Sequence, residues 1–417
     1  MALHIPPSLK HRNFLLLWTG LIISIAGSQM QVSAIHWHIR DLSDKPDPLA
    51  LGAIGLARIL PIILFSLVSG PVADTYNRKT ILVITQTLQA GTAILLAILT
   101  FSKQINIPLI YIITAIQAGA MAFDSPARQA MIPNIVPEKD LPNAYSLLSI
   151  ARNSGAIFGP LLGGIVIATL GQGFTYFFNA ISFLAVIIAL FLIGIVPQDF
   201  KHSAGIHLSA VKEGIQFIIS KPIILSTMLI DFVATFFASA KTMLPIVARD
   251  ILHVGEVGYG ILSAGESIGS LAAGLVISQL SSIKKQGKVF LTAVILFGLA
   301  TIVFGISQTL LLAFFSLVLI GAADSVSTII RNTIRQIQTP DHLRGRMVSI
   351  NQIFFRGGPQ LGELEAGIVG SLFSVPAAIV SGGVGVILAV WWIAKKWPDM
   401  INYDGDENLQ WEKAIKN

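Results

Sequence analysis

Residues 70–101 read GPVADTYNRK-TILVITQTLQAGTAILLAILTF, a short charged stretch followed by a run, from 80 to 101, that contains no charged residue. A helix that spans a bilayer needs about 20 mostly apolar residues. The run is therefore long enough to cross a membrane once, and the charged stretch before it marks where the span begins.

The same alternation of apolar runs and short charged stretches continues along the chain. Of the 417 residues 53% are apolar and 12% are charged, and soluble domains carry about twice that share of charge. Buried helices of a soluble protein are the alternative, which so many successive runs disfavour. We predict an all-α membrane protein with twelve transmembrane helices, at about 14–39, 50–70, 81–101, 107–130, 144–170, 174–196, 222–249, 256–280, 289–308, 310–334, 346–371 and 375–396.

The positions of the basic residues predict the orientation of these spans. Lysine and arginine gather in alternate connections, from Lys10 and Arg12 to Lys395 and Lys396, whereas the connections 171–173 and 372–374 carry no charge. Basic connections stay on the cytoplasmic side of a membrane. We therefore expect a multi-pass protein of the cell membrane (the bacterial inner membrane) with both termini in the cytoplasm. The net charge of +6 is then a signal of topology, and no nucleic-acid partner is expected.

Three short motifs occur twice, in the same order. Residues 122–125 (AFDS), 137–141 (PEKDL) and 159–163 (GPLLG) are echoed by 322–325 (AADS), 340–343 (PDHL) and 358–362 (GPQLG). The repetition predicts two pseudo-symmetric six-helix bundles, 1–196 and 222–397, joined by a cytoplasmic linker, 197–221, and followed by a cytoplasmic tail, 398–417. Parallel halves around a central substrate site are typical of secondary transporters.

The stretch 70–79 resembles the signature of the major facilitator superfamily between spans 2 and 3, with Gly70, Asp74, Arg78 and Lys79 at the matching positions. Asn77 stands where the family has glycine. Because asparagine tolerates a positive φ, we expect the turn to survive. The resemblance implies a cytoplasmic gate, in which Asp74 caps the start of span 11 and Arg78 pairs with Asp124.

Span 5 resembles the family's antiporter motif at Gly155, Gly159, Pro160, Gly163 and Gly164. Small residues let helix backbones approach closely, which suits a leak-tight exporter but also any tightly packed helix pair. The stretches 126–143 and 208–222 are similar to the enterobactin-exporter and macrolide-efflux branch. The superfamily's span-4 arginine would fall near Ala115 and is absent, and Ser28 stands where many relatives have an acid, so proton coupling must use other residues.

Ionisable residues inside a membrane cost at least ~2.5–3.5 kcal/mol each, so each is a functional hypothesis. Similar depth in the bilayer predicts two charge pairs between the bundles, Arg152 with Glu266 and Arg58 with Glu363 or Glu365. Static pairs that hold the fold are the alternative. As carriers of a coupled proton we predict Glu266 and Asp231, with Glu363 third.

The remaining side chains suit a cavity or a membrane interface rather than a cofactor. His36 and His38 flank Trp37 and point apart on a helix, so we expect interfacial residues and no metal site. No phosphate-binding loop, paired-carboxylate site or serine triad is present, so we expect no enzyme and no cofactor, with a proton gradient as the source of energy. The aromatic residues and methionines predicted to line the substrate cavity are Trp18, Met30, Phe123, Phe236, Phe237, Met243 and Phe355.

Together these patterns predict a monomeric secondary transporter that exports an amphipathic small molecule, such as a siderophore, a macrolide or another drug, in exchange for protons by alternating access. An uptake carrier or a lipid-type flippase of the same fold is the first alternative. A non-transporting membrane receptor or assembly partner is the second. It would need a larger extramembrane domain than the linker or the tail provides.

Overall fold

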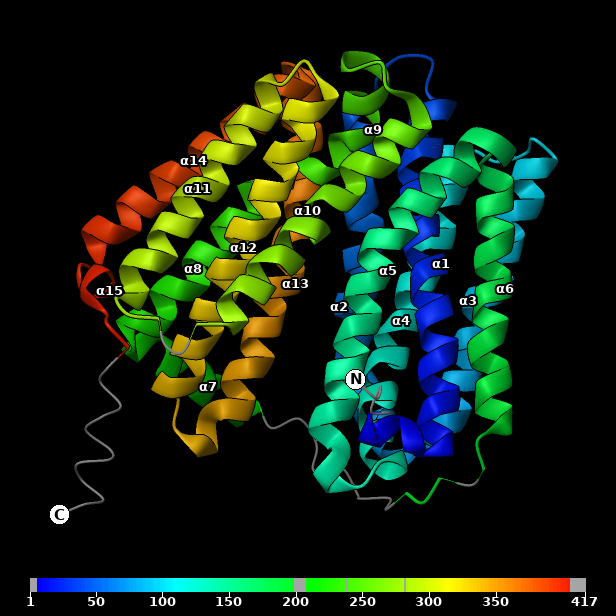
Figure 1. The fold of residues 1–417 in the computed structure, drawn as a ribbon, viewed down its shortest axis with the longest axis horizontal. Coiled ribbons are helices and arrows are strands. Elements are labelled where there is room, and N and C mark those ends of the chain that lie inside the picture. The colour runs from blue at the N-terminus through cyan, green and yellow to red at the C-terminus, as the bar shows by residue number, and fades with distance from the viewer. Residues whose placement is uncertain (1–5, 195, 199–207, 238, 281–282, 406–417) are drawn as a thin grey trace, which may run out of the picture. The chain divides into compact units, whose positions relative to one another are not determined.

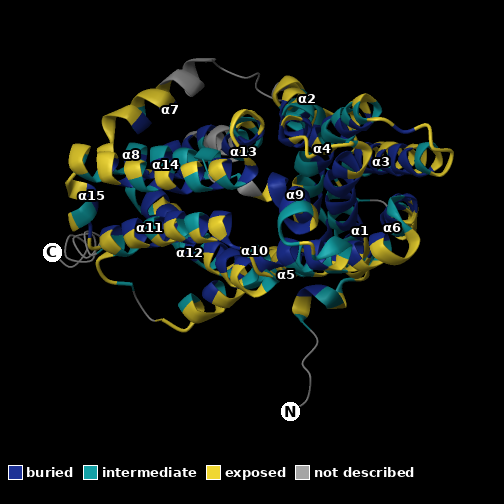
Figure 2. Ribbon diagram, turned by 90° about the horizontal axis from the view of Figure 1, so that it is seen from above, coloured by how far each residue is buried: buried dark blue, intermediate teal, exposed yellow. Residues whose placement is uncertain are grey.

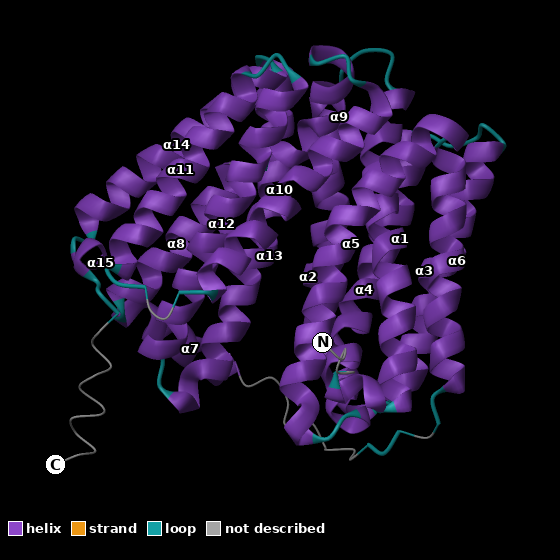
Figure 3. Ribbon diagram, viewed as in Figure 1, coloured by secondary structure: helices purple, strands orange, loops and turns teal. Residues whose placement is uncertain are grey.

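The computed structural model describes residues 6–194, 196–198, 208–237, 239–280 and 283–405. Inside some helices the side chains of further residues, Phe355 among them, lie outside the described set. Within these ranges the regular structure is entirely helical (Figure 3).

The long helices follow the apolar runs of the sequence. The first half of the chain forms α1 (Arg12–Leu42), α2 (Pro48–Thr75), α3 (Arg78–Phe101), α4 (Ile107–Ile135), α5 (Leu141–Leu170) and α6 (Gln172–Leu192). The second half forms α8 (Pro222–Phe237), α10 (Gly255–Ser278), α11 (Gln286–Ile306), α12 (Leu310–Gln338), α13 (Asp341–Leu372) and α14 (Val375–Lys396). The shorter helices are η1 (Pro7–Lys10), η2 (Glu138–Asp140), α7 (Leu208–Ser220), η3 (Ala240–Met243), α9 (Leu244–Ile246), η4 (Val247–Ile251) and α15 (Asp399–Asn402).

Eleven spans of the described chain are long and apolar enough to cross a membrane, one of them being the run Pro222–Ile251, which α8 begins. The remaining long helix, α13, has 32 residues and is about 48 Å long at 1.5 Å per residue. Its charged residues lower its hydropathy, but its length is ample for a span. The predicted twelve-helix membrane fold is confirmed.

The chain forms two compact units (Figure 1). Unit 1 consists of Met1–Pro46, Leu56–Gly205 and Ala248–Ala264, and unit 2 of Asp47–Gly55, Ile206–Val247 and Gly265–Asn417. Each unit thus includes a short segment from the other half of the sequence. The predicted domain boundaries, which follow the sequence halves, stay a prediction.

Each unit has its own apolar core. In unit 1, α1 packs along α5 and α6 through fully buried residues such as Phe14 and Leu17. In unit 2, α11 packs along α12 and α14 through residues such as Phe290 and Ile334. Figure 2 shows that exposed positions occur along the helices, and they include large apolar side chains such as Leu64 and Phe191.

Two details of the spans differ from the sequence-based expectation. Helix α2 continues to Thr75, so most of the signature stretch is helical and the connection to α3 is only Tyr76 and Asn77. Asn77 has a φ of −62°, and its side chain accepts a hydrogen bond from the amide of Thr80. The expected positive φ is wrong, because asparagine serves here as the N-cap of α3.

The seventh span is broken into four pieces, where a single helix was expected. After α8 the chain passes through η3 and α9 into the π-helix η4. Pro245 lies in this region and lacks the amide hydrogen that a continuous α-helix would use. π-helical turns occur frequently at functional sites.

Candidate functional site

A buried cluster of charges lies between α8 and α12 of unit 2. Asp231 on α8 is 2% exposed, and its two carboxylate oxygens lie 2.9 Å from Arg331 Nη2 and 3.3 Å from Arg335 Nη2. Both arginines come from α12 and are as deeply buried as the aspartate. Two guanidinium groups therefore neutralise one carboxylate inside the membrane-spanning part of the unit.

Further polar groups complete the cluster. Arg335 donates hydrogen bonds to Thr227 of α8 and, at 2.7 Å, to the side-chain oxygen of Asn351 on α13. Arg331 donates to Ser327 and reaches Asp324 at 3.4 Å. Two aspartates and two arginines give a net charge of zero, which is the condition under which buried ions are tolerated.

The helical spacing of α12 explains why these side chains meet. Asp324, Ser327, Arg331 and Arg335 are separated by three or four residues and so share one face of the helix. Asp231 was predicted from the sequence as a carrier of the coupled proton, but Arg335 lies just beyond the span predicted to end at residue 334. The four-residue spacing from Arg331 is the signal that would have found it.

A second ion pair in unit 2 is more accessible. Lys241 Nζ lies 3.4 Å from Glu266 Oε2, and the two side chains are 51% and 28% exposed. Glu266 stands where α10 passes close to α12, since a Cβ built on Gly321 would lie 1.8 Å from the Glu266 carbonyl oxygen. The pair joins α10 to the broken seventh span at η3.

In unit 1 the counterpart of Asp324 is Asp124. It is 2% exposed, forms an ion pair with Arg128 one turn further along α4, and accepts hydrogen bonds from Thr85 at 3.1 Å and from Gln86 at 2.7 Å. The predicted partner of this aspartate, Arg78, bonds elsewhere, so that pairing is wrong. Asp124 lies eleven residues before the end of α4, too far from the end of α2 for the pair.

Arg78 and Lys79 instead secure helix ends within unit 1. Arg78 donates to the carbonyl oxygens of Ala73 and Ala130 and to the side chain of Asn134, and its Nη2 lies 3.9 Å from Asp74. Lys79 donates to the carbonyl oxygen of Ile193, just after α6. The predicted capping of the eleventh span by Asp74 would join the two units and stays a prediction.

Two Arg-Asp dipeptides form a reciprocal pair of salt bridges in unit 1. Arg40 at the end of α1 donates to both carboxylate oxygens of Asp250 in η4, with Nε 2.7 Å from Oδ2. Arg249 forms the reverse ion pair with Asp41. We call these four residues the clasp. The first of its two bridges is the more buried, because the Arg40 side chain is 7% exposed and that of Arg249 is 41% exposed.

Close glycine contacts lie beside the clasp. A Cβ on Gly164 of α5 would lie 2.6 Å from the Glu256 carbonyl oxygen and 3.0 Å from the Gly260 Cα of α10. Gly155, Gly159 and Gly163 face α1, and Pro160 is buried. Close approach of two backbones at glycine is what the antiporter-like motif predicted.

Unit 2 contains the same kind of crossing. A Cβ on Gly52 of α2 would lie 2.4 Å from the Glu363 carbonyl oxygen and 2.8 Å from the Gly367 Cα of α13. Gly260 lies four residues after Glu256, just as Gly367 lies four residues after Glu363. The two crossings are therefore pseudo-symmetric, although only the first was found from the sequence.

The predicted charge pairs between the bundles join residues of different units and stay predictions. Arg58 and Arg152 belong to unit 1, whereas Glu266, Glu363 and Glu365 belong to unit 2. Within unit 2, Glu363 lies beside Gly55, and Glu365 has a buried carboxylate oxygen without a hydrogen-bond partner among the described residues.

The predicted cavity residues are held by several different contacts. Trp18 donates to the carbonyl oxygen of Leu147 at 2.9 Å, and the Phe123 ring lies 5.6 Å from that of Phe65. Met30 and Met243 are buried. Phe236 and Phe237 pack edge to face, and Phe355 lies outside the described side chains. Their role in a substrate cavity stays a prediction.

The histidines near the clasp are buried rather than interfacial. The exposed fractions of His36, Trp37 and His38 are 8%, 1% and 5%, His38 Nδ1 lies 3.0 Å from the Tyr176 hydroxyl, and the Trp37 ring lies 5.2 Å from that of Tyr259. The interfacial assignment is wrong, because the 248–264 segment of unit 1 covers this end of α1.

Comparison with known proteins matches this architecture to membrane transporters. The multidrug efflux pump Tap of Mycolicibacterium fortuitum is 26% identical over 394 residues, covering 91% of this chain and 94% of the pump. The staphyloferrin A transporter of Staphylococcus aureus is 25% identical, with coverage of 85% and 88%. The enterobactin exporter EntS of Citrobacter koseri is 23% identical, with 77% of each chain covered.

Solved structures with the same fold have lower sequence identity. A bacterial homologue of the human lysosomal transporter Spinster superposes with a TM-score of 0.70 at 15% identity, covering 95% of this chain and 97% of that one. A bacterial homologue of the iron transporter ferroportin also gives 0.70, at 17% identity, with coverage of 94% and 99%. The family model described as transmembrane secretion effector matches residues 5–415. This multi-pass chain belongs to that family, within the major facilitator superfamily, and is a transporter of small molecules and not an enzyme.

Proposed function

We propose that this protein exports an amphipathic small molecule, a drug or a siderophore, from the cytoplasm in exchange for protons. Similarity to a multidrug efflux pump and to an enterobactin exporter supports the substrate class and the direction. The protein works as a monomer without a cofactor, and both termini face the cytoplasm, as the distribution of lysine and arginine predicts.

The observation that carries the proposal is the difference between the two ionic sites of unit 2. Asp231 is enclosed by two arginines and is 2% exposed, whereas Glu266 pairs with one lysine and is 28% exposed. A group that exchanges protons with water must be reached by water. Glu266 therefore carries the coupled proton, and Lys241 competes with that proton for the carboxylate.

The position of the clasp is an argument for transport by alternating access. Its two salt bridges join the end of α1 to the π-helix η4, the corresponding ends of the first and seventh spans. Arg249 and Asp250 belong to the second half of the sequence although they pack in unit 1. Because alternating access moves one repeat against the other, we expect these bridges to break when the side of the membrane on which they lie opens. On the proposed topology that side is the outer one.

The experiment is transport by the purified protein in proteoliposomes with an imposed pH gradient. We expect a fluorescent drug to move only while the gradient is present, and Glu266→Gln to abolish gradient-driven transport while the protein stays folded. Glu138→Gln, which removes an exposed carboxylate in η2, is the matched control and keeps full transport. Undiminished gradient-driven transport by Glu266→Gln contradicts the assignment.

The absence of cysteine makes the topology directly testable. Single cysteines at Lys103 and at Lys396 are expected to react with a membrane-impermeant maleimide from opposite sides, Lys103→Cys from outside intact cells and Lys396→Cys only after lysis. Labelling of Lys396→Cys in intact cells contradicts the proposed orientation.

A further inference from the structure

Three lysines lie at one end of an apolar groove in unit 2. Lys284, Lys285 and Lys288 line the groove together with α11 and α12, and its volume is about 460 Å³. Its remaining lining residues are Val289, Thr292, Ala293, Leu296, Leu319, Ala322, Ala323 and Val326. Charge is thus confined to one end, and the walls along the two helices are apolar apart from Thr292.

The lysines are held close together by the backbone. Lys285 has a φ of +53° and is the N-cap of α11, and the amide of Gly287 donates a 2.8 Å hydrogen bond to the Tyr403 carbonyl oxygen. All three lysines are exposed, and within the described part of the chain none forms a salt bridge. Three like charges that line one end of a groove repel one another, so this end of the groove attracts an anion.

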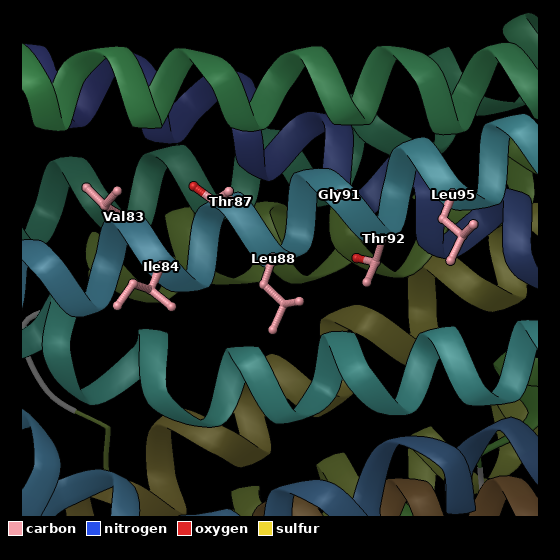
Figure 4. A pocket seen from close by; sticks show the side chains of 7 residues that line it. All are labelled: Val83, Ile84, Thr87, Leu88, Gly91, Thr92 and Leu95. Carbon is pink, nitrogen blue, oxygen red and sulfur yellow. The ribbon is translucent and has the colours of Figure 1, made fainter.

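The corresponding helix of the first half provides a comparison. A groove of about 510 Å³ runs along α3, lined by Val83, Ile84, Thr87, Leu88, Gly91, Thr92 and Leu95 (Figure 4). No charged residue lines it. The basic residues at the start of α3, Arg78 and Lys79, donate to carbonyl oxygens within unit 1 instead. Both halves have an apolar groove, but among the residues that the structure describes only the groove of the second half has lysines without a salt bridge at its end.

We propose that the groove between α11 and α12 binds an anionic phospholipid, with the phosphate at the three lysines and one acyl chain along the apolar walls. The groove lies along two membrane-spanning helices, and its lining residues Thr292, Leu296 and Leu319 are exposed. From Lys288 to Leu296 it extends about 12 Å along the helix axis. Basic pockets between transmembrane helices recognise anionic headgroups, and a lysine near the membrane surface contributes about 1 kcal/mol. The proposal depends on the membrane fold and not on the transported substrate.

The test is native mass spectrometry of the full-length protein in detergent, titrated with phosphatidylglycerol or with phosphatidylcholine of the same acyl chains. We expect phosphatidylglycerol to bind preferentially. The triple variant Lys284→Gln, Lys285→Gln, Lys288→Gln is expected to lose that preference by about fivefold for each lysine removed. The charge-conserving triple change to arginine should retain it.

A matched control separates a site from general surface charge. The triple variant Lys10→Gln, Lys395→Gln, Lys396→Gln removes the same charge from the same predicted side of the membrane and should bind phosphatidylglycerol as the unmodified protein does. The proposal is overturned if the two triple glutamine variants lose phosphatidylglycerol binding equally. It is also overturned if the unmodified protein binds phosphatidylglycerol and phosphatidylcholine equally.

The acyl-chain half of the proposal has its own variant. Thr292→Trp fills the groove at an exposed position and leaves the lysines in place, so we expect weaker lipid binding by a folded protein. Leu319→Trp, also exposed, is a second filling variant from α12. Lipid binding unchanged in both variants, or displacement of the lipid by millimolar inorganic phosphate, assigns the lysines to a simple anion site and overturns the lipid proposal.

Discussion

Asp124 and Asp324 occupy the same place in a repeated Ala-x-Asp-Ser motif, but the two side chains differ in their exposure and in their bonding partners. The Asp124 side chain is 2% exposed and bonds to α3 as well as to Arg128. The Asp324 side chain is 49% exposed, and its Oδ1 lies 3.4 Å from Arg331 Nη1. In unit 2 the deeply buried acid is Asp231, which belongs to a different helix.

The difference shows that a duplicated motif preserves a helix and its position more faithfully than it preserves a side chain's role. In unit 2 the two arginines of α12 both pair with Asp231 on α8, inside the bundle, whereas the motif's own aspartate lies nearer the surface. In the first unit the buried Asp124 has one arginine partner, the partly exposed Arg128, and also accepts hydrogen bonds from Thr85 and Gln86. Substitutions with successively smaller expected losses of stability test how the two units differ.

The largest effect is expected for Asp231→Asn. It leaves Arg331 and Arg335 buried without their counter-ion, and breaking a buried pair in this way costs about 3–5 kcal/mol. Thermal unfolding in detergent should show a large loss of stability. Adding Arg335→Gln should recover part of that loss, and a stable single variant would mean that the cluster is not the ionic centre of unit 2.

The second effect concerns the two glycine crossings, which the units share. Gly164→Val places methyl groups against the α10 backbone and should destabilise unit 1 by about 3 kcal/mol. Gly52→Val is expected to act similarly in unit 2. At Gly91 a Cβ meets nothing within 4 Å, so Gly91→Val is the control. If Gly164→Val loses no more stability than Gly91→Val, the close approach of α5 and α10 at Gly164 is contradicted.

Asp124→Asn should have an intermediate effect. Asparagine keeps one acceptor oxygen for Gln86, but Arg128, 23% exposed, loses its ion pair and turns towards water. A loss of about 2 kcal/mol is expected from the hydrogen bonds given up. A loss as large as that of Asp231→Asn would show that the two acids are equivalent after all.

The clasp is the point at which equivalent dipeptides of the two halves meet. Arg40→Ala removes a buried two-point contact to Asp250 and should cost about 1.5 kcal/mol, with Arg249→Ala costing less because its bridge is exposed. Exchanging the charges with Arg40→Asp and Asp250→Arg should restore part of the stability. Equal losses of stability in Arg40→Ala and Arg249→Ala would contradict the expectation that the more buried bridge contributes more.

Asp324→Asn should have the smallest effect, about 0.5 kcal/mol, since an ion pair of a half-exposed carboxylate contributes little. The same unfolding measurement in detergent tests it beside Asp124→Asn. Equal losses in the two variants would remove the contrast between the units.

The fold was predictable from sequence to within a few residues at most span ends, because lipid requires about 20 apolar residues for each crossing. The buried Asp231 was also predictable, since a charge inside an apolar run stands out. Arg335 was missed because it follows the last apolar turn, where a basic residue looks like part of a loop. The predicted partner of Arg78 was wrong because Arg78 bonds to Ala130 and Asn134, nearer the end of α4 than Asp124. A sequence motif does not record which turn of a neighbouring helix a long side chain reaches.

Composition and the order of apolar runs by themselves determined that the protein is a membrane protein, because the cost of burying charge in lipid acts on each segment separately. The three repeated motifs indicated its two related halves. Tertiary structure alone decided which acid is enclosed by arginine, where the Arg-Asp dipeptides pair and which lysines remain free. These outcomes depend on how helices distant in the chain are rotated against one another. A rotation of a few tens of degrees exchanges a buried partner for an exposed one.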